Sequence, residues 1–293
     1  MLMIVTPIIT LGVFPLVAGT ALKKYMKIEK IPVYLQGYFL QFVFMLLFGA
    51  LFTVGLFSVQ TLAYIWLGVC AAITIVFLVL EYRHFLNEIC LLPNKGKSFL
   101  HDRKRMMILV CEIVLMMGAI LLLEPHWDDM TEEVVVAFQN DGVLLDSMYL
   151  FHAMLQCLTG IPAVVLVRVV LPIFLLPAFY GACRFLVIGL ERYALLSIYA
   201  FYGFMVFVPG YLGLEPFLNI WNPVTIGISV CLPAFVRTLI DCKWSKVNLM
   251  ELLLIGLALQ WCIPQGWLYI TGFVFAYIVV LLSTKLGSNG RDM

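Results

Sequence analysis

The sequence TLAYIWLGVCAAITIVFLVL at residues 61–80 decides the fold class, because it carries no charged side chain over its whole length. As a helix this run would be about 30 Å long, which matches the hydrocarbon core of a bilayer. In lipid, only helices and closed barrels satisfy every backbone N–H and C=O group. The apolar residues are continuous rather than alternating, so the run predicts a transmembrane helix.

The rest of the chain repeats this pattern. Of its 293 residues, 63% are hydrophobic and 12% are charged, against roughly half and a quarter in a soluble domain. Short polar breaks divide it into nine predicted spans, an all-α polytopic bundle. These spans are 4–22, 35–57, 61–82, 106–124, 163–190, 193–213, 222–241, 248–262 and 265–285.

The basic residues predict the orientation of these spans. Lysines and arginines concentrate in the short loops at 23–30 and 83–105, which the positive-inside rule places in the cytoplasm. With the spans alternating from there, the N-terminus lies outside, the C-terminus lies in the cytoplasm, and Arg168 alone of the 18 basic residues lies outside. The first apolar run lacks a preceding basic residue, so we expect a retained span rather than a cleaved signal peptide. The predicted location is a bacterial inner or plasma membrane, crossed many times.

Charge and cysteine content exclude several classes of function. A formal net charge of +1 does not favour nucleic acid as a partner. The eight cysteines are scattered singly without a CxxC motif, and we interpret them as small hydrophobic residues. No P-loop, GxGxxG or GxSxG motif is present, which argues against an NTPase, a dinucleotide enzyme and a serine hydrolase.

One external segment stands out by its acids. Residues 124–147 hold seven carboxylates and neither Lys nor Arg, and the apolar stretch at 149–158 that follows is too short to cross a bilayer. We expect 124–147 to be an external acidic loop, and 149–158 to be a helix lying along the outer interface. The membrane-border aromatic residues, including Trp221, are expected to be headgroup anchors first.

The acidic loop contains the one cluster with catalytic potential. Asp128 and Asp129 are adjacent, and a carboxylate there could act as a general base towards an acceptor hydroxyl or amide. Together with His126, the two aspartates could also hold a divalent cation such as Mg²⁺ or Mn²⁺. The alternative is that an external loop lacking basic residues simply fills with solvating acids.

Other polar residues have two interpretations as well. His152 is either a ligand-binding residue or an interfacial hydrogen-bonding one, and Arg168 either meets a phosphate or extends to the membrane surface. Glu112 lies inside a predicted span, where a carboxyl group is protonated, paired or functional. Five prolines are expected to kink helices and open a cavity between them. These are Pro172, Pro177, Pro209, Pro223 and Pro233.

Three stretches carry a resemblance to a known family. They are the acidic pair with its following helix, the turn Thr159-Gly160-Ile161-Pro162 leading into Arg168-Val-Val-Leu-Pro172, and the tryptophan segment from Asn219 to Pro233. Together, over about 106–240, they resemble an uncharacterised bacterial family of polytopic membrane proteins related to the GT-C glycosyltransferases. The resemblance divides the chain into a three-span bundle at 1–105 and a GT-C-like module at 106–293.

The resemblance also implies a function. In GT-C enzymes, loop acids bind metal or act as the base, and the donor is a polyprenyl-phosphate or polyprenyl-diphosphate sugar. Carried over, Asp128 and Asp129 would be catalytic, and Arg168, His152 and Trp221 would bind substrate on the external face. The alternative is a non-catalytic transporter subunit or a structural component of a membrane complex, with the same loop serving only as a docking element.

Overall fold

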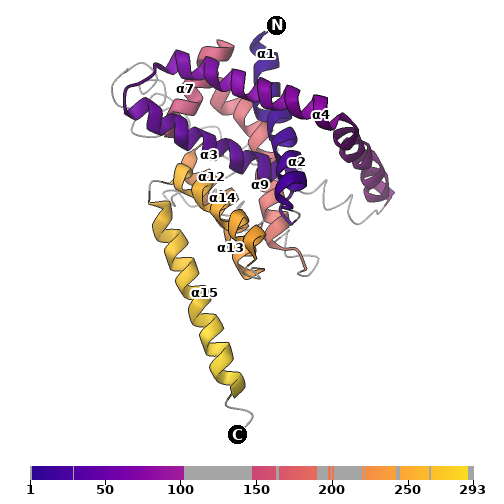
Figure 1. Ribbon diagram of the computed structural model, residues 1–293, viewed down its shortest axis with the longest axis vertical. Helices are drawn as coiled ribbons and strands as arrows, with labels where there is room; N and C mark the ends of the chain where they lie inside the picture. The colour runs from indigo at the N-terminus through magenta and orange to yellow at the C-terminus, as the bar shows by residue number, and fades with distance from the viewer. Residues whose placement is uncertain are drawn as a thin grey trace.

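The computed structural model contains helices joined by turns, and no strand, over the residues it describes, which are 2–28, 30–101, 147–162, 165–189, 197–198, 200, 220, 222–241, 245–263 and 265–289 (Figure 1). The first helices are α1 (Leu2–Pro7), the π-helix η1 (Ile8–Val13), α2 (Phe14–Met26), α3 (Val33–Thr53) and α4 (Val59–His101). The middle ones are α7 (Ser147–Thr159), the π-helix η3 (Leu166–Val170) and α9 (Leu171–Leu186). The last ones are α12 (Pro223–Ile226), the π-helix η4 (Gly227–Cys231), α13 (Leu232–Ile240), α14 (Lys246–Cys262) and α15 (Gly266–Asn289).

Four helical stretches among the described residues are long and apolar enough to cross a membrane. They are Val5–Met26, Val33–Phe52, Val59–Glu81 and Pro223–Ile240. These stretches match the first, second, third and seventh predicted spans, so the prediction of an all-helical membrane protein is confirmed. The predicted spans 106–124 and 193–213 fall wholly or almost wholly outside the described residues, and the total of nine and the orientation stay predictions.

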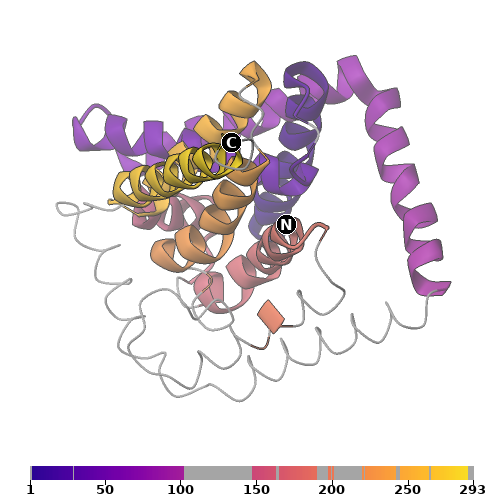
Figure 2. The ribbon, with the colours of Figure 1, turned by 90° about the horizontal axis from the view of Figure 1, so that it is seen from below.

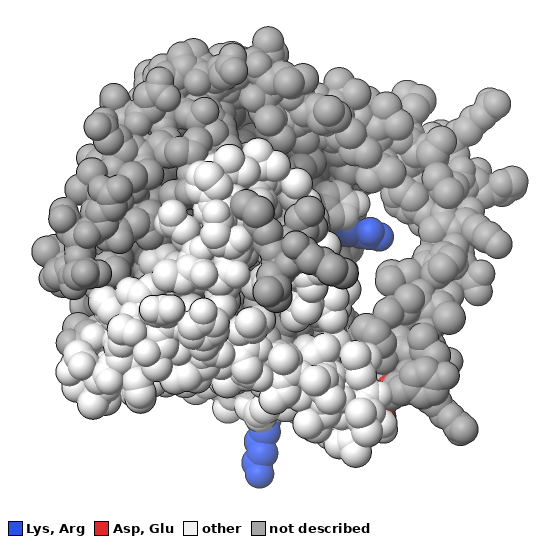
Figure 3. Space-filling view, turned by 90° about the horizontal axis from the view of Figure 1, so that it is seen from above, with Lys and Arg blue, Asp and Glu red and all other residues white. Residues whose placement is uncertain are grey.

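The surface of α4 shows why a membrane is required. One side of this helix is buried against the bundle through Leu62, Trp66 and Cys70, whereas the other side exposes Tyr64, Ile75 and Val79, among others, and is equally apolar. A helix that is apolar on its exposed face is normally covered by lipid. In Figure 3, the described surface on one face of the molecule is likewise almost free of charge. The helix has a non-helical residue at Glu81 and then continues to His101, where the sequence predicted a loop.

Three of the apolar helices contain a π-helical segment, and each segment ends two residues before a proline. The pairs are Val13 and Pro15, Val170 and Pro172, and Cys231 and Pro233. Just before each proline, an N–H group donates to the carbonyl five residues back: Phe14 to Ile9, Leu171 to Leu166, and Leu232 to Gly227. Proline lacks an N–H and its ring clashes with the carbonyl four residues earlier, so a wider turn lets the helix continue.

The predicted role of the prolines is therefore only partly right. Pro172 and Pro233 follow widened turns rather than ending their helices, and Pro177 lies inside α9. Pro223 does not kink a helix but begins one, because Asn222 caps α12 by accepting a hydrogen bond from the Val224 N–H at 2.9 Å. Pro209 lies outside the described residues.

A close helix crossing joins α2 to α3 through two glycines. A Cβ atom on Gly19 would collide with the backbone carbonyl of Val33, and one on Gly37 would collide with that of Pro15. Both collisions are with backbone, which cannot rotate away as a side chain can. Small residues at a crossing are how membrane helices bring their backbones together, so Gly19 and Gly37 fix this contact.

The C-terminal helix α15 differs from the others. Of the described helices it packs mainly against α14 and α13, and it extends away from the bundle as a separate rod (Figure 1). Seen from below, it lies in front of the other helices (Figure 2). Most of its side chains between Trp267 and Val280 are exposed, including Phe273 and Phe275, whereas Ile270, Val274 and Tyr277 pack partly against the core. The described part of the chain thus leaves the other face of α15 uncovered, and that face is apolar.

Candidate functional site

The predicted catalytic residues fall outside the part of the chain that the structure describes. This applies to Asp128, Asp129 and His126, and also to Trp221. Arg168 lies in the π-helix η3, where its backbone is described. Whether these side chains meet at one site thus stays a prediction, and His152 is the one predicted site residue whose side-chain surroundings the structure describes.

His152 is enclosed by protein. It belongs to α7, whose residues 150–155 are all buried, and its own exposure is 0%. Its ring centroid lies 6.3 Å from that of Phe151, which in turn contacts Trp261 edge-on at 6.2 Å, and Trp261 stacks on Phe42 at 4.7 Å. The sequence predicted an interfacial helix at 149–158. The helix is present, and α1, α3, α4 and α14 pack against it, whereas its place at the outer interface stays a prediction.

This burial changes the acid–base behaviour of His152. α7 is too short to cross a bilayer, yet the protein around it excludes water, and burial lowers the pKa of the His152 imidazole to about 3. The ring is therefore neutral at physiological pH. A neutral imidazole can accept one hydrogen bond and donate another, but it does not bring a positive charge to a phosphate.

A tight turn connects α7 to the helix that carries Arg168. The Thr159 hydroxyl donates to the Leu155 carbonyl at 2.7 Å, and the Gly160 N–H donates to the Gln156 carbonyl at 2.8 Å. Gly160 has a φ of 66°, a conformation that favours glycine, so it ends the helix as the sequence predicted. In the sequence, α7 and this turn are followed by η3, which carries Arg168, and then by α9.

Two tyrosines on α3 form hydrogen bonds that link η1 to α9. The Tyr38 hydroxyl donates to the Leu11 carbonyl at 2.7 Å, and the Tyr34 hydroxyl donates to the Phe174 carbonyl at 3.0 Å. The two hydroxyl groups also lie 3.2 Å apart. Leu11 stands four residues before Pro15, which has no N–H to offer its carbonyl. The tyrosine pair thus satisfies a buried backbone acceptor in η1 and ties it to α9.

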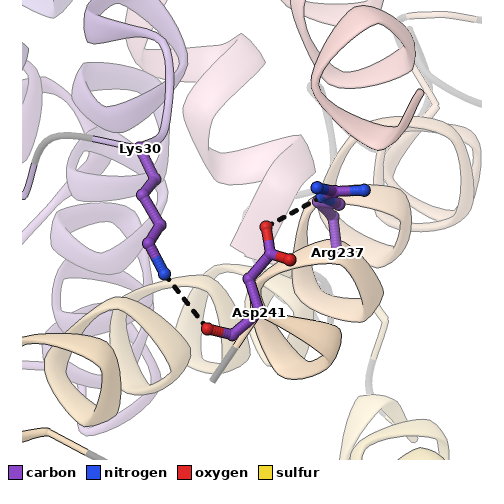
Figure 4. Close-up of polar contacts among 3 residues, drawn as sticks. All are labelled: Lys30, Arg237 and Asp241. Carbon is purple, nitrogen blue, oxygen red and sulfur yellow. Dashed lines mark hydrogen bonds and ion pairs between the residues drawn. The ribbon is translucent and has the colours of Figure 1, made fainter. Parts of the chain in front are cut away.

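A charged junction lies where the loop after α2 meets the C-terminal end of α13 (Figure 4). Arg237 donates through Nε to Asp241 Oδ2 at 2.9 Å, and Lys30 donates through Nζ to the Asp241 carbonyl at 3.1 Å. Lys30 also interacts electrostatically with Glu251 on α14, a carboxyl group that is only 1% exposed. Asp241 therefore accepts hydrogen bonds from two basic residues, Arg237 and Lys30, which lie more than 200 residues apart in the chain.

A second charged contact joins α2 to α4. Lys24 forms an ion pair with Glu81, and the Tyr25 hydroxyl donates to the same carboxylate at 2.9 Å. The sequence predicted cytoplasmic loops at 23–30, at 83–105 and after the span 222–241, and Lys24, Glu81 and Asp241 lie in or next to these segments. Both charged contacts thus join positions that the charge pattern assigned to the same side of the membrane.

The sequence interpretation missed the residues that organise this interior. Tyr34, Tyr38 and Gln36 were not singled out, although each is a polar group within an apolar helix. That is the same signal that drew attention to Glu112. Gln36 is fully buried and donates to the Ile28 and Ile31 carbonyls at 2.9 and 2.6 Å, which holds the loop after α2 against α3.

Comparisons with known proteins add no family to this description. Searches against protein-family models, curated proteins and solved structures found no match. Within the described residues, no group of three or more His, Cys, Asp or Glu side chains could hold a metal ion. The predicted ligands Asp128, Asp129 and His126 lie outside that search.

Proposed function

We propose that this protein transfers a sugar from a polyprenyl-phosphate-type donor on the external face of a membrane. In this proposal Asp128 and Asp129 are catalytic, and Arg168, His152 and Trp221 contribute to substrate binding. A bacterial inner or plasma membrane is the proposed location, with nine spans and the N-terminus outside.

The observation that carries the proposal is the position of α7. This helix follows the acidic loop in the sequence, and it packs against α4, α1, α3 and α14. It makes its ring contacts with Trp261, near the C-terminal end of α14, whereas the charged junction involves Glu251, near the beginning of that helix. The described chain that follows the acidic loop therefore begins at α7, whose ring contact lies at the opposite end of α14 from Glu251, and this supports an external position for Asp128 and Asp129.

The chemistry follows from the residue types. A carboxylate of Asp128 or Asp129 would accept the proton of the acceptor group as that group attacks the sugar. A basic side chain such as Arg168 would balance the charge that develops on the departing lipid phosphate. A divalent cation, if the aspartates and His126 hold one, would absorb charge at the same phosphate. The neutral His152 would serve as a hydrogen-bonding residue.

A matched set of loop variants tests the proposal. Asp128→Asn and Asp129→Asn remove one charge each at nearly constant size, and Glu132→Gln removes one from the same loop at a position outside the pair. We expect the aspartate variants to lose at least about 100-fold in transfer from a polyprenyl-phosphate sugar, with the Glu132 variant unaffected. Equal activity in all three variants, each eluting as the wild-type protein does in gel filtration, would discard the catalytic role of the pair.

A second candidate, a non-catalytic subunit of a transporter or another membrane complex, is favoured by α15. This helix presents apolar side chains on all sides beyond its contact with α14 and α13, and such a surface can receive a helix of another protein. Purification from native membranes in a mild detergent separates the candidates. A stoichiometric partner lost on deleting residues 266–289 supports the second, whereas a monomer with transfer activity supports the first.

A further inference from the structure

Two cysteines meet where η4 packs against α14. The sulfurs of Cys231 and Cys262 lie 3.9 Å apart, and both residues are 0% exposed. The first is the last residue of the π-helix η4, and the second is the last residue of α14. They come from different helices, so a bond between them would join two parts of the bundle covalently.

A glycine brings these helices close enough for the sulfurs to touch. Gly227 lies one turn before Cys231, and a Cβ atom there would stand 2.6 Å from the Ile263 side chain and 3.1 Å from the Cβ of Cys262. With any larger residue at 227, Cys262 and Ile263 would have to move away. The contact between the two sulfurs thus depends on a close approach that this glycine permits.

We propose that Cys231 and Cys262 are a disulfide-forming pair, which a lipid-soluble oxidant of the quinone class converts from two thiols to one disulfide. A disulfide needs its sulfurs about 2.05 Å apart, so they must approach by about 2 Å. Cys231 ends a widened turn next to Pro233, where the helix lacks one regular hydrogen bond, and this gives the segment room to adjust.

The reaction balances with the quinone as the acceptor. The two thiols lose two protons and two electrons as the S–S bond forms. The quinone takes up the two protons and the two electrons and becomes a hydroquinone. The burial of the pair within an apolar bundle selects this class of oxidant, because a quinone dissolves in the bilayer. Polar oxidants such as glutathione disulfide remain in the aqueous phase. The product is a covalent link between η4 and α14.

Peptide mapping of the full-length protein in native membranes tests this inference. Membranes are treated with a short-chain benzoquinone or with a phosphine reductant, remaining thiols are alkylated after denaturation, and the unreduced digest is analysed by mass spectrometry. We expect a linked peptide containing positions 231 and 262 after quinone treatment and none after reduction. Cys231→Ser and Cys262→Ser should each abolish the link, whereas Cys70→Ser should retain it.

The exposed Cys157 provides an internal control for the treatment, since its thiol is accessible to reagents without any rearrangement. If Cys157 is modified by the quinone while Cys231 and Cys262 of the wild-type protein are both recovered as alkylated thiols, the pair does not form a disulfide. This result needs no variant, so it is independent of whether the serine substitutions fold. It is also independent of the proposed sugar transfer, which does not involve either cysteine.

Discussion

The α2–α3 pair and α15 are apolar to a similar degree in sequence, yet they are used in opposite ways. Between Leu35 and Phe39, every residue of α3 is buried, whereas α15 exposes most of its side chains from Trp267 to Val280. Hydrophobicity alone predicted a span in both places. It says that a helix belongs in a membrane, but it does not say whether the helix will face protein or lipid.

The difference comes from a few small and polar residues. At the α2–α3 crossing, Gly19 and Gly37 remove the side chains that would keep the backbones apart, and Tyr38 bonds to the Leu11 carbonyl. In α15, Gly272 meets nothing within 4 Å, and the Thr271 hydroxyl bonds only within its own helix. Packing inside a membrane is therefore decided by local fit and hydrogen bonding, since lipid is as apolar as the side chains themselves.

The largest effect is expected from Gly37→Ala. The new methyl group would overlap the Pro15 carbonyl, so α2 and α3 must separate, at a cost of about 3 kcal/mol in the free energy of unfolding. Thermal unfolding of purified protein in detergent measures the loss. Gly68→Ala on α4 is the matched control, because a Cβ there meets nothing within 4 Å, and a comparable loss in that variant would contradict the crossing.

The tyrosine pair should show the next largest effect, and a non-additive one. With Tyr38→Phe alone, Tyr34 can still donate to the Leu11 carbonyl, to which it lies 3.2 Å away, so we expect a loss of about 1 kcal/mol. With both replaced by Phe, the Leu11 carbonyl loses both tyrosine donors while facing Pro15, and about 2 to 3 kcal/mol should be lost. Chemical denaturation of the two single variants and the double variant measures this coupling.

A control for the tyrosine experiment is Tyr64→Phe on the exposed side of α4, where a hydroxyl group is removed from a residue that is 60% exposed. This variant should unfold as the wild-type protein does. If the losses from Tyr34 and Tyr38 simply add, the two hydroxyls do not share their acceptors.

A third expected effect is a sensitivity to acid that arises from His152. Its folded-state pKa of about 3 lies below the ordinary value of 6.5, so the unfolded chain binds the extra proton first and stability falls as the pH drops below about 6.5. At pH 5.5 the loss should be about 1.4 kcal/mol relative to pH 8. Unfolding of wild type and His152→Gln at both values isolates the contribution. An unchanged pH response in the variant would show that another group is responsible.

The sequence predicted most helices of the described part but few of the contacts between them. The apolar runs at 35–57, 61–82 and 248–262 became α3, the first half of α4, and α14, because length and hydropathy determine them. The glycine crossing and the tyrosine pair depend on which helices are neighbours, and hydropathy contains no such information. The candidate site at Asp128 and Asp129 falls outside the described residues and remains a prediction.

The smallest effect is expected at α15, and it bears on the second candidate function. Gly272→Ala adds a methyl group that meets nothing within 4 Å, so stability in detergent should change by less than about 1 kcal/mol, in either direction. The informative measurement is the same variant in native membranes, beside Gly272→Leu. If α15 faces only lipid, both variants behave as wild type in blue-native gels, because lipid adapts to a larger side chain. If α15 packs against a partner helix, Gly272→Leu should dissociate the complex while the protein itself remains folded, since a bulky residue at a helix crossing separates the two backbones.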